Sequence, residues 1–408
     1  MPMKFGSTKV SPAAVVRIGI AGLVGAFLLP AVVANGMANY AEEEREIAML
    51  RDVDPARFPD AGARLAELRL RLGDPAGAAR IGLVAATHDP LNVRAVRVVG
   101  LAREMLEDRS ATPIMRQALR LGWRDTPTLL WGLRDAAERE DVEGVLEIVD
   151  ALARRQVQGE VTRPLLMAAL VDEVSRIAFV ERLAQEPSWR EAFFNDVQAS
   201  LDPAVFDGME DVFERMAATS SPPRPSERLR YIERVLQTGD FERARAFWMR
   251  SSDIDVSARS DVPFDPRFEH VASRAPGAPV SRFEWNVNNG AGRSVAFETR
   301  GDRTVLRVTP GSNPGSVLLS QSLGLAPGTH VIRSEVLEGS GGTLPAEWQL
   351  LCAASETPLV RRYTRGTQDR LSRIEVTVPE NCPVQTLRLN STSVFGGAPV
   401  IIGSVTVD

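Results

Sequence analysis

The sequence predicts a multidomain protein with α and β parts: a membrane helix within residues 1–40, an α-solenoid over 41–261 and an antiparallel β-sandwich over 262–408. Three observations predict this order. An uncharged apolar stretch lies near the N-terminus, apolar residues then recur at helical spacing, and short β-type runs alternate with turn residues after Asp261. The chain has 408 residues, which is more than one ordinary domain requires.

The composition excludes several classes of function. Hydrophobic residues make up 44% of the chain and charged residues 25%, which is typical of a globular protein. The net charge of −5 argues against a general nucleic-acid binder, so we expect no nucleic-acid partner. Only three histidines (His88, His270 and His330) and two cysteines are present. We therefore expect neither a metal nor a cofactor.

The N-terminal segment predicts the compartment. Lys4, Lys9 and Arg17 precede the uncharged stretch Ile18–Ala34, and four glutamates follow between residues 42 and 46. Positive charge before the span places its N-terminus in the cytoplasm and the body outside. Its 17 residues would span about 25 Å, slightly short of a hydrocarbon core of about 30 Å and slightly long for a signal-peptide core. A single-pass anchor in a bacterial inner membrane, with the body in the periplasm, is the favoured interpretation. A cleaved signal peptide is the alternative.

The body of the chain begins with a series of helices. A capping side chain followed by proline marks a helix start, because the cap accepts a free backbone N–H and proline has none to lose. Six such pairs occur, at Asp54-Pro55, Asp74-Pro75, Asp89-Pro90, Thr112-Pro113, Thr126-Pro127 and Asp202-Pro203. Asp54 and Asp89 are 35 residues apart, and Asp74 and Thr112 are 38 apart. A period in this range, made of two helices, is typical of a solenoid.

The stretch from Leu65 to Pro90 resembles a tetratricopeptide repeat. Gly73-Asp74 occupies the turn between the two helices, and Ala78 and Ala85 occupy the small packing positions of the second helix. Partial matches recur at Gly132, Gly144 and Ala151, and at Gly239-Asp240, Ala244 and Trp248. The resemblance implies a scaffold that binds protein partners, here other envelope proteins.

The repeat signature is not continuous. Residues 155–225 keep the helical periodicity but lose the signature, and Thr219–Pro225 is expected to form a loop before a final helical pair.

The second half of the body is predicted to form β structure. Turn clusters separate nine short β-type runs, and no long helical stretch interrupts them, which predicts an antiparallel β-sandwich. The runs are Phe283–Asn286, Ser294–Thr299, Thr304–Val308, Val317–Gln321, His330–Leu337, Trp348–Cys352, Arg373–Val378, Gln385–Leu389 and Ile401–Val407.

This half resembles the jelly-roll, galactose-binding-like modules that include many carbohydrate-binding modules. The resemblance rests on the opening segment Phe264–Glu269, the turn Pro327-Gly328 and the closing run Val400–Asp408. It implies a jelly roll that binds a glycan. It also implies a structural calcium held by the opening glutamate and an acidic residue of the last strand. Glu269 matches, but Gly403-Ser404 stands where the acidic pair is usual, which argues against calcium.

The two cysteines predict one disulfide. Cys352 and Cys382 lie 30 residues apart, each beside a β-type run. In an oxidising compartment such a pair forms a structural bond, which would contribute about 3 kcal/mol by restricting the unfolded chain. Two buried, reduced thiols are the alternative. No Cys-x-x-Cys motif indicates redox chemistry.

The candidate ligand-binding residues are aromatic rings with nearby arginines. A sugar stacks on an exposed ring, and guanidinium groups bind carboxylates or phosphates in two-point contacts. The expected set is Tyr363, Arg361, Arg362 and Arg365, in a stretch that reads as an exposed loop, with Trp348 as a second ring. Trp285 is expected in the core, and the pattern leaves Trp348 open between core and surface.

No sequence motif indicates catalysis. The chain lacks a Gly-x-Ser-x-Gly elbow, a Walker loop and a His-Glu-x-x-His motif, and its neighbouring acidic residues are best interpreted as solvated charge. We therefore expect a non-catalytic, membrane-anchored envelope scaffold with a glycan-binding module, as in proteins of surface or exopolysaccharide assembly and export. The alternative hypothesis is a scaffold for protein–protein interaction alone, with a structural sandwich.

Overall fold

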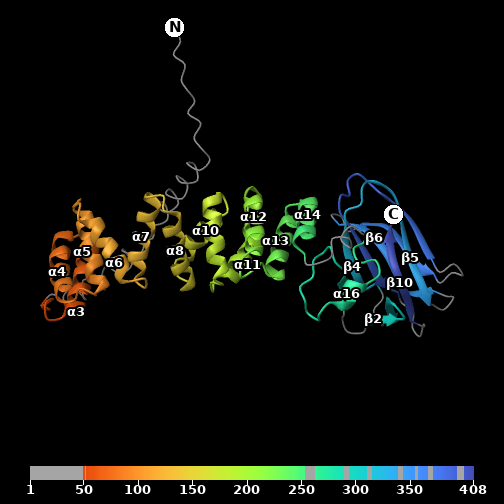
Figure 1. The fold of residues 1–408 in the computed structure, drawn as a ribbon, viewed down its shortest axis with the longest axis horizontal. Coiled ribbons are helices and arrows are strands. Elements are labelled where there is room, and N and C mark those ends of the chain that lie inside the picture. Colours follow the sequence, from red (N-terminus) through yellow and green to blue (C-terminus); the bar gives the residue numbers. More distant parts are fainter. Residues whose placement is uncertain are drawn as a thin grey trace, which may run out of the picture. The chain divides into compact units, whose positions relative to one another are not determined.

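The structure is a computed structural model that describes residues 49–50, 52–252, 262–288, 294–309, 315–338, 343–353, 357–365, 371–392 and 399–408. The apolar stretch Ile18–Ala34, expected to be a membrane helix or signal, lies outside these residues. Within the described ranges, none of the helices combines the length and the apolar character needed to cross a bilayer. Helices occupy the first part of the described chain and strands the second (Figure 1).

Helices fill most of the chain from Pro59 to Ser251. They are α3 (Pro59–Arg71), α4 (Pro75–His88), α5 (Val93–Met105), α6 (Ala111–Leu121), α7 (Thr126–Glu138), α8 (Val142–Arg154), α9 (Gly159–Ala168), α10 (Glu173–Ala184), α11 (Arg190–Ser200), α12 (Phe206–Ala217), α13 (Pro225–Gln237) and α14 (Phe241–Ser251). As expected, the run that begins at Thr219 precedes the final pair α13 and α14, although its last residue, Pro225, is the first residue of α13.

The predicted helix starts are confirmed at some positions and shifted at others. Asp74 caps α4, because its carboxylate accepts a hydrogen bond from the Gly77 N–H at 2.8 Å. Asp125, one residue before the predicted Thr126, caps α7. Asn92 rather than Asp89 caps α5, since the chain makes a turn after Asp89 before the helix begins. Asp202-Pro203 introduces a short 3₁₀ turn instead of an α-helix.

The first helical pair packs through small side chains. Gly73, with φ of +80°, turns the chain between α3 and α4, which is a backbone conformation that glycine adopts without strain. Ala78 and Ala85 on α4 are fully buried, as the sequence predicts for packing positions. They contact Ala66 and Ala63 on α3, so the two helices approach closely.

Polar bridges join alternate helices across intervals of about thirty residues. Asn92 donates to Asp60 at 2.7 Å, Arg97 to Glu67 at 2.9 Å, and Arg134 pairs with Glu104. Burial opposes ionisation of Glu67, but Arg97 and neighbouring guanidinium groups lower the pKa of its carboxyl below the ordinary value. These bridges connect α3 to α5 and α5 to α7.

The described chain divides into two compact units. One comprises the described residues up to 193 together with 204–222, and the other comprises 194–203 together with the described residues from 223 onward. The final helical pair, α13 and α14, lies in the same unit as the sandwich. Aromatic side chains join them: Phe241 lies 5.2 Å from Phe283, and Trp248 lies 5.2 Å from Phe264, measured between ring centroids.

The second unit contains two five-stranded antiparallel sheets. Sheet A has the order β1-β4-β9-β6-β7 and sheet B the order β2-β3-β10-β5-β8. The strands are β1 (Asn286–Val287), β2 (Ser294–Arg300), β3 (Arg303–Thr309), β4 (Val317–Leu323), β5 (Gly328–Glu338), β6 (Thr343–Cys352), β7 (Thr357–Arg365), β8 (Leu371–Val378), β9 (Gln385–Ser391) and β10 (Val400–Val407). A short helix, α16 (Glu269–Ser273), precedes β1.

The predicted antiparallel sandwich is thus confirmed, with one strand missed. Nine expected runs correspond to strands, although β1 covers only the end of the first run. The additional strand β7 includes Arg361–Arg365, which was expected to be a loop. Hydrogen bonding to the neighbouring β6 makes it a strand despite its polar sequence.

The core of the sandwich lies between the two sheets and contains both tryptophans of the β region. Trp285 and Trp348 are 1% and 0% exposed, and their ring centroids lie 6.1 Å apart. The Trp285 indole N–H donates to the Asp265 carbonyl at 2.9 Å, and that of Trp348 donates to the Ser334 hydroxyl on β5 at 3.2 Å. Each buried ring therefore has its polar atom satisfied.

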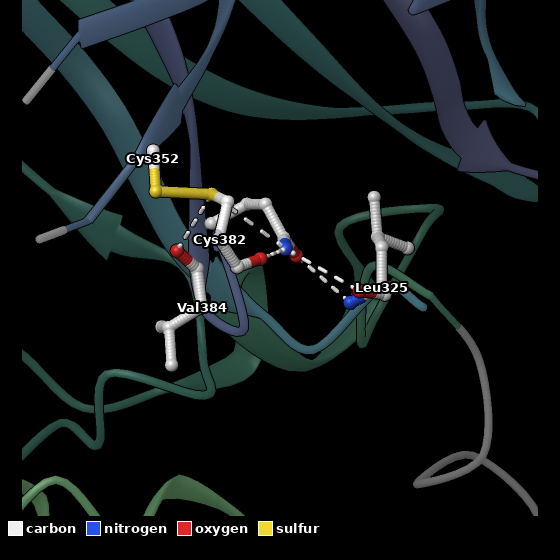
Figure 2. Close-up of a disulfide and its surroundings, with 5 residues drawn as sticks. Leu325, Cys352, Cys382 and Val384 are labelled. Atoms are coloured by element: carbon white, nitrogen blue, oxygen red, sulfur yellow. Dashed lines mark hydrogen bonds between the residues drawn. A yellow bond between two sulfur atoms is a disulfide. The ribbon is translucent and has the colours of Figure 1, made fainter. Parts of the chain in front are cut away.

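The predicted disulfide is present. Cys352 ends β6, Cys382 precedes β9, and their Cα atoms lie 5.5 Å apart (Figure 2). The bond links the two ends of the segment that contains β7 and β8. Each of these strands forms one edge of its sheet. Beside the disulfide, the fully buried Gln385 side chain accepts from the Leu325 N–H at 2.8 Å and donates to the Cys382 carbonyl.

Candidate functional site

The outer face of sheet A presents hydrogen-bonding side chains in ordered rows. In β4, β9 and β6, residues such as Leu319, Leu389 and Trp348 join the core. Successive residues of a strand point to opposite faces, so the residues between them lie on the outer face.

The strand register aligns one polar row across the whole sheet. Asn286 on β1 lies opposite Ser320 on β4, which lies opposite Arg388 on β9, which lies opposite Gln349 on β6. Gln349 in turn lies opposite Arg361 on β7. At roughly 4.8 Å between neighbouring strands, this row is about 19 Å long.

A second row runs beside the first. Asn390 on β9 lies opposite Glu347 on β6, and Glu347 lies opposite Tyr363 on β7. We call the two rows together the polar face: Asn286, Ser320, Arg388, Gln349 and Arg361, with Asn390, Glu347 and Tyr363. Ser322 and Thr386, also opposite each other, border them.

The register between β6 and β7 separates the predicted ligand-binding residues of β7 into two groups. Arg361 and Tyr363 fall at positions of the polar face. Arg362 pairs with Trp348, and Arg365 pairs with Thr343 near the strand end. The register therefore brings two of the four expected residues to one face of the sheet and separates them from Arg362.

The expectation that Trp348 offers a second stacking surface is wrong. Its side chain is 0% exposed and its N–H is bonded to Ser334, so the ring packs in the core and bridges the two sheets. Alternation along β6 explains the outcome, because Glu347 and Gln349 take the outward positions on either side of it.

Gln349, Arg388 and Asn390 were not among the residues predicted from the sequence. Thr386, Arg388 and Asn390 alternate with Leu387 and Leu389, which is a signal of an outward polar set on that strand. However, the row across five strands depends on register between segments distant in sequence, which no local pattern encodes.

Uncharged amides form the centre of the polar face. Gln349 and Asn390 are 7% and 4% exposed, although they lie on the outer side of the sheet. The Gln349 amide donates to the Glu347 carboxylate. The Asn390 Oδ1 atom is buried, and no hydrogen-bond donor reaches it within the described residues. A buried acceptor without a partner is costly, and a ligand that displaced the atoms covering it would supply the missing donor.

The outer face of sheet B differs, because ion pairs between its own strands occupy it. Arg307 donates to Glu298 at 3.0 Å, Arg303 lies 3.6 Å from Glu335, and Arg300 pairs with Glu338. The hydrogen bond from Arg307 lowers the pKa of the Glu298 carboxyl. Charged side chains that already pair with each other have fewer hydrogen-bonding groups available to a ligand.

The histidines and acidic residues give no metal centre in the described part of the chain, where no three potential ligands from His, Cys, Asp and Glu come together. His88 lies at the end of α4 with its Nδ1 atom 3.0 Å from the Val84 carbonyl, and His330 Nε2 lies 2.7 Å from the Ala326 carbonyl. Glu269 begins α16.

The described chain is thus a helical region followed by an antiparallel β-sandwich with polar rows on the outer face of sheet A. No protein-family model matches the chain, and no curated protein matches its sequence. Two solved structures are similar to part of it. One, from work on CBM4 structure and function, is 16% identical over 28% of this chain and 77% of its own, with a TM-score of 0.23. The other, from work on the promiscuous specificity of carbohydrate-binding modules of the β-sandwich superfamily, is 16% identical over 35% of this chain and 61% of its own, with a TM-score of 0.24.

Proposed function

We propose that this chain is a non-catalytic binding protein whose sandwich binds a polysaccharide on the polar face. The observation that supports this most directly is the row Asn286, Ser320, Arg388, Gln349 and Arg361, which crosses all five strands of sheet A. A polymer needs such an extended surface, whereas a small molecule needs a pocket.

The chemistry of the face suits sugar hydroxyls. Amides and hydroxyls supply donors and acceptors together, so a neutral hydroxyl can both give and receive a hydrogen bond there. A row about 19 Å long accommodates several consecutive sugar rings. Tyr363 would add a stacking surface and Arg361 a charged donor at the edge strand. A shallow face of this kind would bind with a Kd between about 1 mM and about 1 μM.

The helical region is proposed to be a tetratricopeptide-like scaffold for envelope proteins. The turn at Gly73, the buried Ala78 and Ala85, and bridges between residues about thirty positions apart support this. Exposed apolar side chains offer contact area: Leu91 is 75% exposed, Met105 57% and Val174 63%. The same observation supports the second candidate function, a scaffold for proteins alone.

The proposal places the body in the bacterial periplasm, tethered to the inner membrane by the segment Ile18–Ala34, with a role in surface or exopolysaccharide assembly or export. The charge pattern around that segment and the Cys352–Cys382 bond support this placement. Protease added to spheroplasts should digest the body and leave a small membrane-bound fragment. A body protected in intact spheroplasts would contradict the topology.

Binding of the full chain to a panel of neutral and acidic polysaccharides tests the function. Thr386→Ala on the border of the polar face should weaken binding, while Thr406→Ala, an outward threonine on sheet B, should leave it unchanged. Both side chains are half-buried and lie on central strands, which makes them a matched pair. If no polysaccharide binds, or if the two variants behave alike, the protein-interaction function replaces this one.

A further inference from the structure

A cavity of about 240 Å³ lies within the second unit, between the helices α13 and α14 and the segment 270–284. It is separate from the polar face, since its walls include no residue of sheet A. A buried cavity of roughly 150 Å³ is large enough to hold benzene. This one therefore has room for a single six-membered ring with substituents.

One wall of the cavity is apolar. Leu229 and Ile232 on α13 and Trp248 on α14 line it. Trp248 is 3% exposed and packs against Phe264 and Phe283, so its ring is fixed and only a small part of it reaches the cavity. Leu229 is more exposed and forms more of this wall. A rigid apolar wall is a suitable surface for the C–H face of a flat ligand.

The opposite wall is polar and built from Glu284, His270 and Arg274. Glu284 is 9% exposed, and its Oε1 accepts from the Ser281 N–H at 3.3 Å. Its Oε2 lies 3.3 Å from His270 Nε2 and 3.4 Å from the Arg274 guanidinium. Both distances are at the long end of the hydrogen-bond range, so the carboxylate and the guanidinium keep capacity for a closer partner.

The polar wall is fixed by its surroundings. Arg274 donates to the Trp285 carbonyl at 2.7 Å. The backbone N–H groups of His270 and Val271 donate to the Asp265 carboxylate at 3.1 and 2.9 Å, which holds the start of α16. The three polar groups are therefore ordered before a ligand binds, so binding does not carry the entropic cost of ordering them.

The charges in this wall select against simple ions. Glu284 faces Arg274 and His270, so an anion would meet the carboxylate and a cation would meet the guanidinium. A neutral ligand with several hydroxyls can donate to Glu284 and accept from Arg274 at the same time.

We propose that this cavity binds one neutral sugar ring, with its C–H face against the apolar wall that Leu229 forms in front of Trp248, and its hydroxyls on Glu284 and Arg274. The site goes beyond the polar face and does not depend on it. A flat face requires a polymer, whereas this cavity would accept a monosaccharide.

Ligand-observed NMR with the full chain and glucose, galactose, mannose or N-acetylglucosamine tests the proposal. At least one should bind, and Leu229→Trp, which fills the cavity, should abolish binding. Leu91→Trp, at a side chain that is 75% exposed, is the control and should change nothing. Glu284→Gln keeps the shape and removes the charge, and should weaken binding roughly tenfold.

The outcomes separate this site from the polar face. Thr386→Ala should leave monosaccharide binding unchanged even where it weakens polysaccharide binding. If no monosaccharide binds, if Glu284→Gln and folded Leu229→Trp bind as well as wild type, or if the cavity takes only peptides, the proposal is overturned.

Discussion

Sheets A and B enclose one apolar core, yet their outer faces differ in chemistry. On sheet B, carboxylates and guanidinium groups of neighbouring strands pair with each other, as in Glu298 with Arg307. On sheet A, amides and hydroxyls form rows across the strands, and the acceptor Asn390 Oδ1 is buried. Self-paired charges stabilise a surface modestly and leave little to recognise. Asn390 Oδ1 keeps an unused acceptor, so the proposed binding function rests on sheet A.

The largest effects should separate the inside of sheet A from its outer face. Trp348→Ala removes a fully buried ring that bridges the sheets, so it should lower the free energy of unfolding by about 3 to 5 kcal/mol. Tyr363→Ala should leave that free energy nearly unchanged and weaken polysaccharide binding. Urea unfolding and a binding assay on both variants measure this. If both variants lost the same free energy of unfolding, Tyr363 would stabilise the fold and would not be a ligand-binding residue.

The disulfide should rank next. Replacing Cys352 and Cys382 by serine frees a 30-residue loop that carries β7, and should lower the free energy of unfolding by about 3 to 4 kcal/mol. Polysaccharide binding should weaken in parallel because β7 forms one edge of the polar face. Denaturation of the oxidised and variant proteins compares the two states. An unchanged midpoint would mean that sheet A does not depend on this bond.

Asn390→Leu should distinguish a functional residue from a structural one. The substitution removes a buried acceptor, so stability should stay constant or rise while polysaccharide affinity falls by about 1 to 3 kcal/mol, roughly fivefold to more than a hundredfold. Calorimetric binding and thermal unfolding of one preparation give both values. A large loss of stability would show that Asn390 supports the fold.

The smallest expected effect is on the stability of the protein at acidic pH, and it arises from Glu298 on sheet B. Because the pKa of Glu298 is lowered in the folded state, its stabilising contribution is present above the ordinary carboxyl value of 4.5 and is lost as the pH falls through the lowered value. Glu298→Gln should therefore reduce the loss of melting temperature below pH 4.5 and leave neutral-pH binding intact. A binding change at neutral pH would extend the recognition surface to sheet B.

Much of the architecture could be predicted from local sequence. Caps such as Asp74, the glycine turn at Gly73 and the alternation of β4 and β9 are encoded within a few residues, and they appear as expected. Strand β7 was missed because its arginine-rich sequence has no apolar alternation, and its pairing with β6 is a tertiary interaction.

The candidate site was predictable only in part for the same reason. Tyr363 and Arg361 were predicted from residue type and remain predictions as ligand contacts, whereas their neighbours Gln349 and Asn390 are defined by register between strands far apart in the chain. Trp348 illustrates the limit: a single step along β6 moves a side chain from the outer face to the core, and residue type alone does not fix that step.

Backbone hydrogen exchange of the full chain, with and without a bound polysaccharide, shows which sheet the polymer contacts. If sheet A binds it, protection should increase at β4, β9, β6 and β7 and stay unchanged at β3, β10 and β5, because the polar rows lie on sheet A. Protection on sheet B, or none on either sheet with polysaccharide bound, would contradict binding by sheet A.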